Sequence, residues 1–161
     1  MKWDYEFDVV VVGSGNGALT SAICSHDGGA KTLVIEKSNQ YGGTSATSGG
    51  GVWIPNNRYA KAENVDDSDQ DARDYINSVS PEGMIKDELI ETYISEGPKM
   101  IDYLHENSQV KYRNLSHYPD YFPDNPGGKE GNRSMEPEPI NGTILGTDLG
   151  KLREQHPQTA F

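Results

Sequence analysis

The sequence predicts an α/β fold that opens with a single β-α-β unit and continues into helices and an aromatic, proline-rich loop. Three observations support this class. A β-branched run at residues 7–12 leads directly into a glycine turn, helix-compatible residues follow, and a second apolar run at residues 32–35 ends in an acid. An open parallel sheet needs several strands covered on both faces, and only one such unit is identifiable. The parallel sheet is therefore expected to be incomplete.

The first strand is expected at Phe7 to Val12 and the first helix at Leu19 to His26, with a glycine turn between them. Gly13 lets the chain leave the strand sharply, and Gly15 presents no side chain to a pyrophosphate that approaches the backbone. Ala18 is small enough for the helix to pack closely on the strand. The helix points its free N–H groups and the positive end of its dipole at the turn. The predicted phosphate-binding residues are Gly13, Gly15, Asn16, Gly17 and Ala18.

The second strand is expected at Thr32 to Ile35 and ends in Glu36, which lies twenty-three residues after Gly13. A carboxylate at this distance can accept hydrogen bonds from the hydroxyls of a ribose. It would repel a 2′-phosphate, which disfavours NADP. The whole unit is thus Rossmann-like and predicts a site for a dinucleotide.

A second glycine-rich loop occupies residues 41–51, with five glycines and four hydroxyl-bearing Ser and Thr residues. Successive N–H groups in such a stretch can form a concave anion site, and Thr44, Ser45 and Ser48 offer further donors. The composition also fits a flexible linker. However, the loop follows the acidic strand end directly and leads into Trp53 and Pro55, which argues against a linker.

Two helices are expected between residues 81 and 107, where apolar residues recur at steps of three and four. Ser80 and Pro81 fit the cap and first position of the first helix. Gly97 and Pro98 should separate the two, with Pro98 opening the second. The apolar faces, which we expect to form core, carry Ile85, Leu89, Tyr93, Ile94, Ile101 and Leu104.

The preceding acidic stretch, residues 63–74, is expected to be a solvated surface loop that leads into a short helix. A calcium loop is the alternative. The glycine of its sharp turn and its closing glutamate are both missing, so no function is assigned.

Residues 112–128 form an aromatic loop stiffened by three prolines. Proline restricts itself and its predecessor, so the Tyr118-Pro119 and Phe122-Pro123 pairs should hold extended backbone around Tyr121. Such a loop can keep a phenol in a defined place. Composition alone favours the simpler role, in which these tyrosines only pack.

Composition excludes several classes of function. A net charge of −11 and a pI near 4.7 argue against nucleic acid, which recruits clustered Lys and Arg. The single Cys24 rules out a disulfide framework and is expected to be buried in the first helix. The four histidines show no metal-ligand spacing, so no metal is predicted. No signal region or membrane-spanning stretch is evident, so membrane association is not indicated and cytoplasmic residence is expected.

The motifs together resemble the flavoproteins related to fumarate reductase, and within them the 3-ketosteroid Δ1-dehydrogenases. The resemblance covers almost the full chain. It is carried by DVVVVGSGNGA at residues 8–18, VIEK at 34–37, YGGTSATSGGGVWIPNN at 41–57 and PDYFPDNPGG at 119–128, and also by the later NRSMEPEPING and LGKLREQHPQTAF segments.

This resemblance implies that the cofactor is FAD. In that family the glycine turn contacts the pyrophosphate, the acid contacts the adenosine ribose, and the second glycine loop runs along the pyrophosphate and flavin. Matched to this chain, the cofactor-binding residues extend to Glu36, Lys37, Gly43, Thr44, Ser45, Ser48, Gly49 and Gly50. The matching catalytic residue is Tyr121, which would lie beside the substrate and assist a second Tyr.

The resemblance also implies a division of the chain and a reaction. Residues 1–60 would hold the FAD-binding unit and second glycine loop, 61–110 a helical segment, and 111–161 an aromatic and proline-rich segment that leads toward a substrate domain. The reaction would desaturate a 3-ketosteroid by C2 proton removal and C1 hydride transfer to FAD. The proton-abstracting Tyr would lie beyond Phe161, so we expect this chain alone to be inactive.

Two alternatives remain open at this stage. A related FAD-dependent enzyme could act on another carbonyl or a dicarboxylate, or the chain could be a non-catalytic FAD-binding subunit completed by a partner chain. The physiological electron acceptor is not assigned. The nucleotide sequence past the codon for Phe161 would discriminate between these hypotheses.

Overall fold

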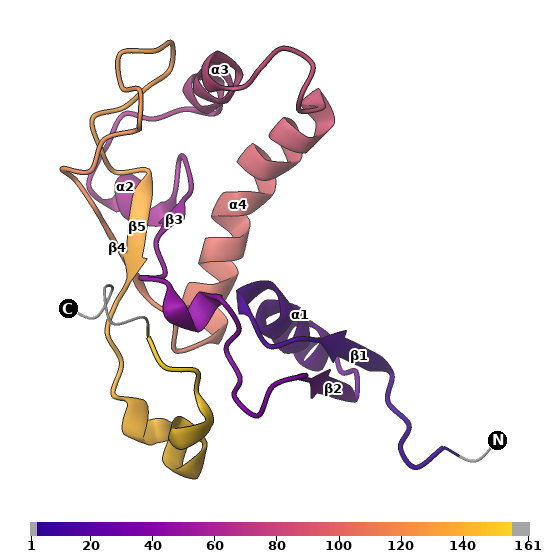
Figure 1. Cartoon of the computed structure of the whole chain (residues 1–161). Helices are drawn as coiled ribbons and strands as arrows, with labels where there is room; N and C mark the ends of the chain where they lie inside the picture. Colours follow the sequence, from indigo (N-terminus) through magenta and orange to yellow (C-terminus); the bar gives the residue numbers. More distant parts are fainter. Residues whose placement is uncertain (1–2, 156–161) are drawn as a thin grey trace. The chain divides into compact units, whose positions relative to one another are not determined.

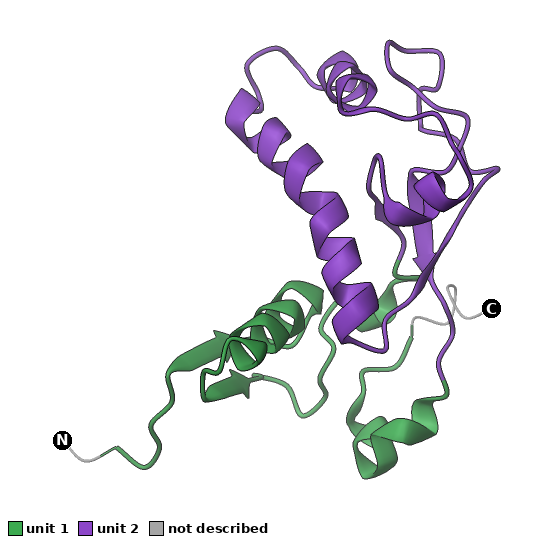
Figure 2. Cartoon of the chain, turned by 180° about the vertical axis from the view of Figure 1, so that it is seen from behind, with its two compact units in different colours: residues 1–50, 141–161 green, residues 51–140 purple. Residues whose placement is uncertain are grey.

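The computed structural model describes residues 3–155 of the 161-residue chain. The chain divides into two compact units (Figure 2). Unit 1 combines Met1–Gly50 with Asn141–Phe161, and unit 2 is Gly51–Ile140. Each unit contains its own small sheet.

The β-α-β unit that the sequence predicts forms the N-terminal part of unit 1 (Figure 1). Strand β1 (Val9–Val12) pairs in parallel with β2 (Thr32–Ile35), with Val9 opposite Thr32. Helix α1 (Asn16–Asp27) connects them and packs on both strands. The α/β class and the incomplete parallel sheet are confirmed, since unit 1 has a two-stranded sheet within the described residues. The helix begins three residues earlier than predicted, directly after the glycine turn.

The second glycine loop is ordered by short-range structure and by the C-terminal segment of the same unit. Its middle forms a 3₁₀ turn, η1 (Ser45–Thr47). At its start, Tyr41 and Leu152 form a parallel bridge after a second 3₁₀ segment, η2 (Gly142–Lys151). Residues 41–50 of the loop therefore belong to unit 1 and do not form a flexible linker.

Unit 2 contains three helices, α2 (Arg58–Ala62), α3 (Asp69–Val79) and α4 (Asp87–Asn107). The predicted break at Gly97-Pro98 is wrong, because α4 continues through Pro98 as one helix of 21 residues. Proline removes a helical hydrogen bond, but the buried face of α4 holds the helix on both sides of it. Gly97 lies in that face, where an added Cβ would contact Ile54 at 3.4 Å.

A three-stranded antiparallel sheet completes unit 2 in the order β3-β5-β4. Its strands are β3 (Val52–Trp53), β4 (Tyr112–Asn114) and β5 (Ser134–Pro137). The sequence did not predict them, because strands of two to four residues carry too little periodicity to detect. One core cluster joins Met135 of β5 with Ile101 of α4 and with Ile54, which follows β3. A second cluster of Ala72, Ile90 and Ile94 lies between α3 and α4.

Three further predictions about local structure are corrected. Ser80 and Pro81 do not cap a helix: α3 ends at Val79, and a turn precedes α4. Cys24 is exposed, because α1 covers only two strands and has no buried residue. The acidic stretch does lead into α3, with Ser68 as its N-cap, yet Asp67 is not solvated. Its side chain is 3% exposed and pairs with Arg133 at 2.6 Å.

We predict that Ile101→Ala lowers the free energy of unfolding by about 3 kcal/mol, because it opens a cavity in a fully buried cluster. The neighbouring Met100 is 38% exposed, so Met100→Ala is the matched control and should cost below about 1 kcal/mol. Urea unfolding followed by circular dichroism measures both variants. Equal losses in the two variants would contradict the position of the core.

Candidate functional site

The glycine turn, the acidic strand end and the second glycine loop surround one cavity in unit 1. Its volume is about 700 Å³. Ten of the predicted cofactor-binding residues line it: Gly13, Gly15, Asn16, Gly17, Ala18, Glu36, Lys37, Gly43, Thr44 and Ser45. Segments that are distant in the sequence thus form one concave surface, as the dinucleotide prediction requires.

Backbone conformation and close packing explain the glycines of this cavity. Gly13 has φ of 95°, which a residue with a side chain rarely adopts. A Cβ on Gly43 would lie 3.4 Å from the Cα of Gly15, and a Cβ on Gly15 would lie 3.4 Å from the Oγ of Ser45. The two glycine loops therefore pack against each other through their backbones.

The N-terminus of α1 opens onto the cavity with donors available. Gly15 occupies the N-cap position and provides no side-chain cap. The N–H of Asn16 donates to the Oγ of Ser45 at 3.0 Å. The N–H groups of Gly17 and Ala18 belong to the first turn, so no carbonyl within the helix accepts from them. They are suited to bind the oxygens of a phosphate.

Glu36 is held in place by Ser14, a residue that the sequence analysis did not assign. The buried Ser14 hydroxyl donates to the Oε2 of Glu36 at 2.5 Å and accepts from the N–H of Gly42 at 2.9 Å. The N–H of Ser38 donates to the other carboxylate oxygen at 3.0 Å. These hydrogen bonds, that of Ser14 first, lower the pKa of Glu36 below its ordinary value of 4.5. The carboxylate retains lone pairs for ribose hydroxyls.

The structure places the remaining predicted cofactor residues differently. Ser48, Gly49 and Gly50 do not line this cavity, and the Ser48 hydroxyl accepts from the N–H of Gly50 at 3.2 Å within its own loop. Conversely, Arg153 lines the cavity and was not predicted. The only sequence signal for Arg153 was its place in the LGKLREQ motif, because the bridge between Tyr41 and Leu152 that brings it to the cavity is a tertiary contact.

Unit 2 has a second cavity of about 280 Å³ at the proline-stiffened loop, and four of its nine lining residues are aromatic. Tyr121 and Tyr118 line it, and Phe122 does not. Tyr121 is 84% exposed, whereas the preceding Asp120 is buried. The other residues of the lining are Trp53, Tyr75, Ile76, Val79, Pro119, Asp120 and Ser134.

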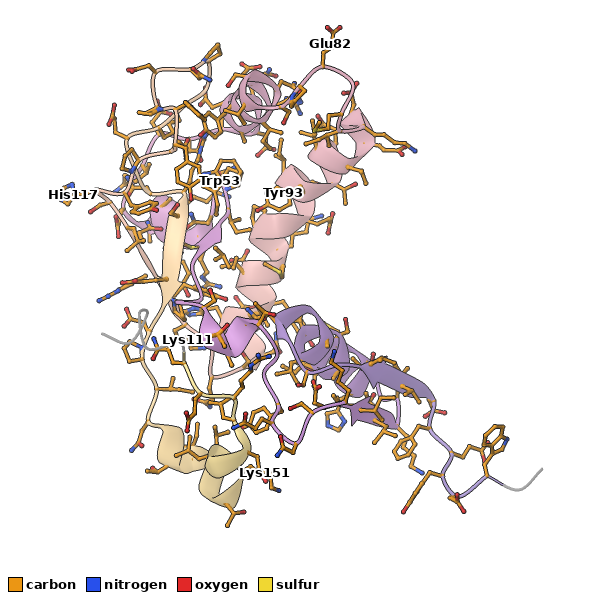
Figure 3. All side chains as sticks on the ribbon, in the orientation of Figure 1. Trp53, Glu82, Tyr93, Lys111, His117 and Lys151 are labelled. Carbon is orange, nitrogen blue, oxygen red and sulfur yellow. The ribbon has the colours of Figure 1, made fainter. Side chains whose placement is uncertain are left out.

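Trp53 connects this cavity to the helices of unit 2. Its ring stacks on that of Tyr93, with centroids 6.2 Å apart. Both residues are labelled in Figure 3. The Tyr93 hydroxyl donates to the backbone carbonyl of Trp53, and burial raises the pKa of that phenol. The Trp53 wall of the cavity is therefore fixed to α4.

Comparison with known proteins identifies the family. The family model described as an FAD binding domain matches residues 8–160. The chain belongs to this FAD binding domain family. The predicted cofactor, FAD, and the predicted flavoprotein resemblance are thereby confirmed.

Two of the most similar relatives are dehydrogenases of cyclic ketones by name. The chain is 42% identical over 147 residues to a 3-oxosteroid 1-dehydrogenase of Mycobacterium tuberculosis, covering 91% of this chain and 26% of that protein. It is 39% identical to a 4-oxocyclohexanecarboxylate 2-dehydrogenase of Sinomonas cyclohexanicum, covering 89% of this chain and 25% of that protein. The chain thus spans about a quarter of the length of the curated relatives it matches.

A solved structure gives the same assignment. The 3-ketosteroid Δ1-dehydrogenase of Sterolibacterium denitrificans, crystallised with 1,4-androstadiene-3,17-dione, superposes with a TM-score of 0.89 at 40% identity. The match covers 95% of this chain and 27% of that one. The fold of this chain therefore matches about a quarter of that dehydrogenase.

Within residues 3–155, no helix is long and apolar enough to span a membrane. The same residues contain no group of three or more His, Cys, Asp or Glu side chains arranged to hold a metal ion.

We predict that Gly15→Val abolishes retention of FAD. The valine methyl groups would extend from a Cβ that already lies 3.4 Å from Ser45, into the space where a pyrophosphate meets the backbone. Flavin absorbance per mole of purified protein measures the effect. Gly150→Val is the control, since a Cβ there meets nothing within 4 Å. A Gly15→Val protein that purifies with bound FAD would refute the phosphate contact.

We also predict a pH dependence that Ser14 controls. A carboxylate accepts hydrogen bonds from ribose hydroxyls best when it is ionised, so FAD affinity should fall as pH drops through the lowered pKa of Glu36. Ser14→Ala removes the largest cause of that shift, and the loss should begin at a higher pH. Fluorescence titration with FAD at decreasing pH measures it.

Ser38→Ala is the matched control, because Ser38 contacts Glu36 through its backbone N–H, which the substitution keeps. Coincident pH profiles for wild type and Ser14→Ala would show that the hydroxyl does not tune the carboxylate.

Proposed function

We propose that this chain is the FAD-binding part of an enzyme that introduces a double bond between C1 and C2 of a 3-ketosteroid. The observation that carries the proposal is the unit 1 cavity, where both glycine loops and an oriented carboxylate converge. Support comes from the similarity to a dehydrogenase that was crystallised with a steroid dienedione.

The residues of unit 1 fit the dinucleotide part of FAD. The first-turn N–H groups of Gly17 and Ala18 would bind the pyrophosphate, and Glu36 the adenosine ribose. Lys37 and Arg153 add positive charge to the same lining. Gly49 and Gly50 would contact the cofactor further along the second loop. When bound, FAD supplies the acceptor for the hydride that leaves the substrate.

The aromatic cavity of unit 2 suits the face of an apolar ring system, and Tyr121 would lie beside the reacting carbons. A carbonyl acidifies the adjacent carbon, so a base can remove the C2 proton. A phenol, with a pKa near 10, is a poor base at neutral pH unless neighbouring donors stabilise the phenolate. The role proposed for Tyr121 is to donate such a hydrogen bond to a second, proton-abstracting phenol.

A cyclic keto acid is the second candidate substrate, because one relative is named for 4-oxocyclohexanecarboxylate. The lining of the unit 2 cavity favours a neutral ligand. Its only ionisable groups are tyrosines and Asp120, and no Lys or Arg lines it within the described residues. A substrate carboxylate would therefore gain no ion pair here, and the same argument weighs against a dicarboxylate.

We expect the protein expressed from the full reading frame that contains this chain to oxidise a 3-ketosteroid with an artificial electron acceptor. Product is measured as the dienone by chromatography. The isolated 161-residue chain should retain FAD and show no turnover. Turnover by the isolated chain would overturn the claim that further residues supply the base. FAD binding by the full protein with no turnover of any cyclic ketone would favour a non-catalytic subunit.

Tyr121→Phe should lower kcat in the full protein by about tenfold or more, because it removes the phenol that stabilises the base. Tyr118→Phe is the control, since Tyr118 lines the same cavity and is proposed only as apolar wall. Steady-state kinetics separate kcat from KM. Equal and small effects of the two substitutions would show that Tyr121 only packs.

A further inference from the structure

The residue before Tyr121 is buried where an exposed loop would be expected. The Asp120 carboxylate is 2% exposed and accepts from the Trp53 indole N–H at 2.6 Å. Its second oxygen accepts from the Arg133 guanidinium at 2.9 Å and from the N–H of Lys129 at 3.0 Å. The N–H of Asp120 donates to the carbonyl of Lys129 at 2.9 Å. Asp120 thus closes the loop that contains Tyr121 by bonds from both its side chain and its backbone.

Arg133 is the cation that makes this burial possible. Its side chain is 2% exposed and forks between two carboxylates, those of Asp67 and Asp120. The guanidinium carbon lies 5.5 Å from the Trp53 ring centroid and 5.7 Å from that of Tyr75. A planar guanidinium can pair two carboxylates and stack on aromatic rings at once, and lysine cannot.

The residue after Tyr121 is tied to the same cluster. The N–H of Phe122 donates to the Tyr75 hydroxyl at 3.3 Å, and the Tyr75 ring packs on Trp53 with centroids 5.8 Å apart. Both neighbours of Tyr121 in the chain are therefore bonded to the cluster that Arg133, Trp53 and Tyr75 form, which we call the Arg133 cluster. Tyr121 itself is 84% exposed and lines the cavity.

We propose that Arg133, acting through Asp120, is a positioning residue that sets the direction of the Tyr121 phenol in the aromatic cavity. The inference rests on the proposed role of Tyr121. It explains why a charged cluster is buried beneath an exposed tyrosine: the loop is held at its backbone, which leaves the phenol exposed and available to a ligand.

A double-mutant cycle in the full protein tests the inference. Asp120→Asn and Asp67→Asn each remove one carboxylate from Arg133, so both should lower the unfolding temperature. Only Asp120→Asn releases the Tyr121 loop. Asp120→Asn should lower kcat about tenfold, and adding Tyr121→Phe to it should change kcat by less than about twofold. In the Asp67→Asn background, Tyr121→Phe should keep its wild-type effect.

The outcomes separate positioning from stability. If Tyr121→Phe has its full effect in the Asp120→Asn background, the two residues act independently and the positioning role is overturned. If both Asn variants abolish the effect of Tyr121→Phe equally, the cluster acts through general stability and the proposal also fails. Flavin content is measured for every variant so that loss of cofactor is not read as loss of kcat.

A spectroscopic readout keeps the inference testable even if the proposed reaction is wrong. With 3-fluorotyrosine at position 121, wild type should give one ¹⁹F resonance displaced from that of a free peptide. Asp120→Asn and Arg133→Lys should move it to the free-peptide position, and Asp67→Asn should not. A wild-type resonance at the free-peptide position would overturn the positioning role. Absence of turnover with a displaced wild-type signal would overturn only the reaction.

Discussion

The buried guanidinium of Arg133 is the interaction on which unit 2 depends most. It pairs with carboxylates from two segments that are distant in the sequence, the acidic stretch and the aromatic loop. Leaving one member of a buried ion pair without its partner costs about 3–5 kcal/mol. We therefore expect the two segments to unfold together. The antiparallel strands and α4 supply the apolar core beside it. The ion pair of Arg133 and Asp120 thereby holds Trp53, which lines the cavity of unit 2, in place.

In unit 1, two glycine-rich loops are held against each other without bulky side chains. Ser14 does this with one hydroxyl, which joins the first loop, the second loop and the carboxylate of Glu36. Direct backbone packing between Gly15 and Gly43 completes the contact. The resulting surface offers main-chain donors, which suits a diphosphate without a dedicated lysine. Cofactor binding in this chain is thus a property of backbone geometry more than of any single side chain.

The predictions succeeded where local patterns decide structure and failed where packing does. The β-branched run, glycine turn and acid were recognisable because period and turn chemistry are local signals. Pro98 was misjudged because the force that carries α4 through it is the burial of its apolar face, which no local rule contains. Asp67 was taken for a solvated residue because its partner is 66 positions away. Arg153 was missed for the same reason.

The sequence by itself determined the β-α-β unit, the dinucleotide chemistry of its glycine turn and the family, because each depends on residues close together in the chain. Only the tertiary structure decided which residues face the cofactor cavity. It also revealed that Asp120 is buried while Tyr121 is exposed. The burial of Asp120 depends on Arg133, Trp53 and Tyr75, which lie close together in the fold. Their positions in the sequence do not reveal that proximity. Burial of charge is decided by such distant partners, because a carboxylate enters a core only when a cation and donors meet it there.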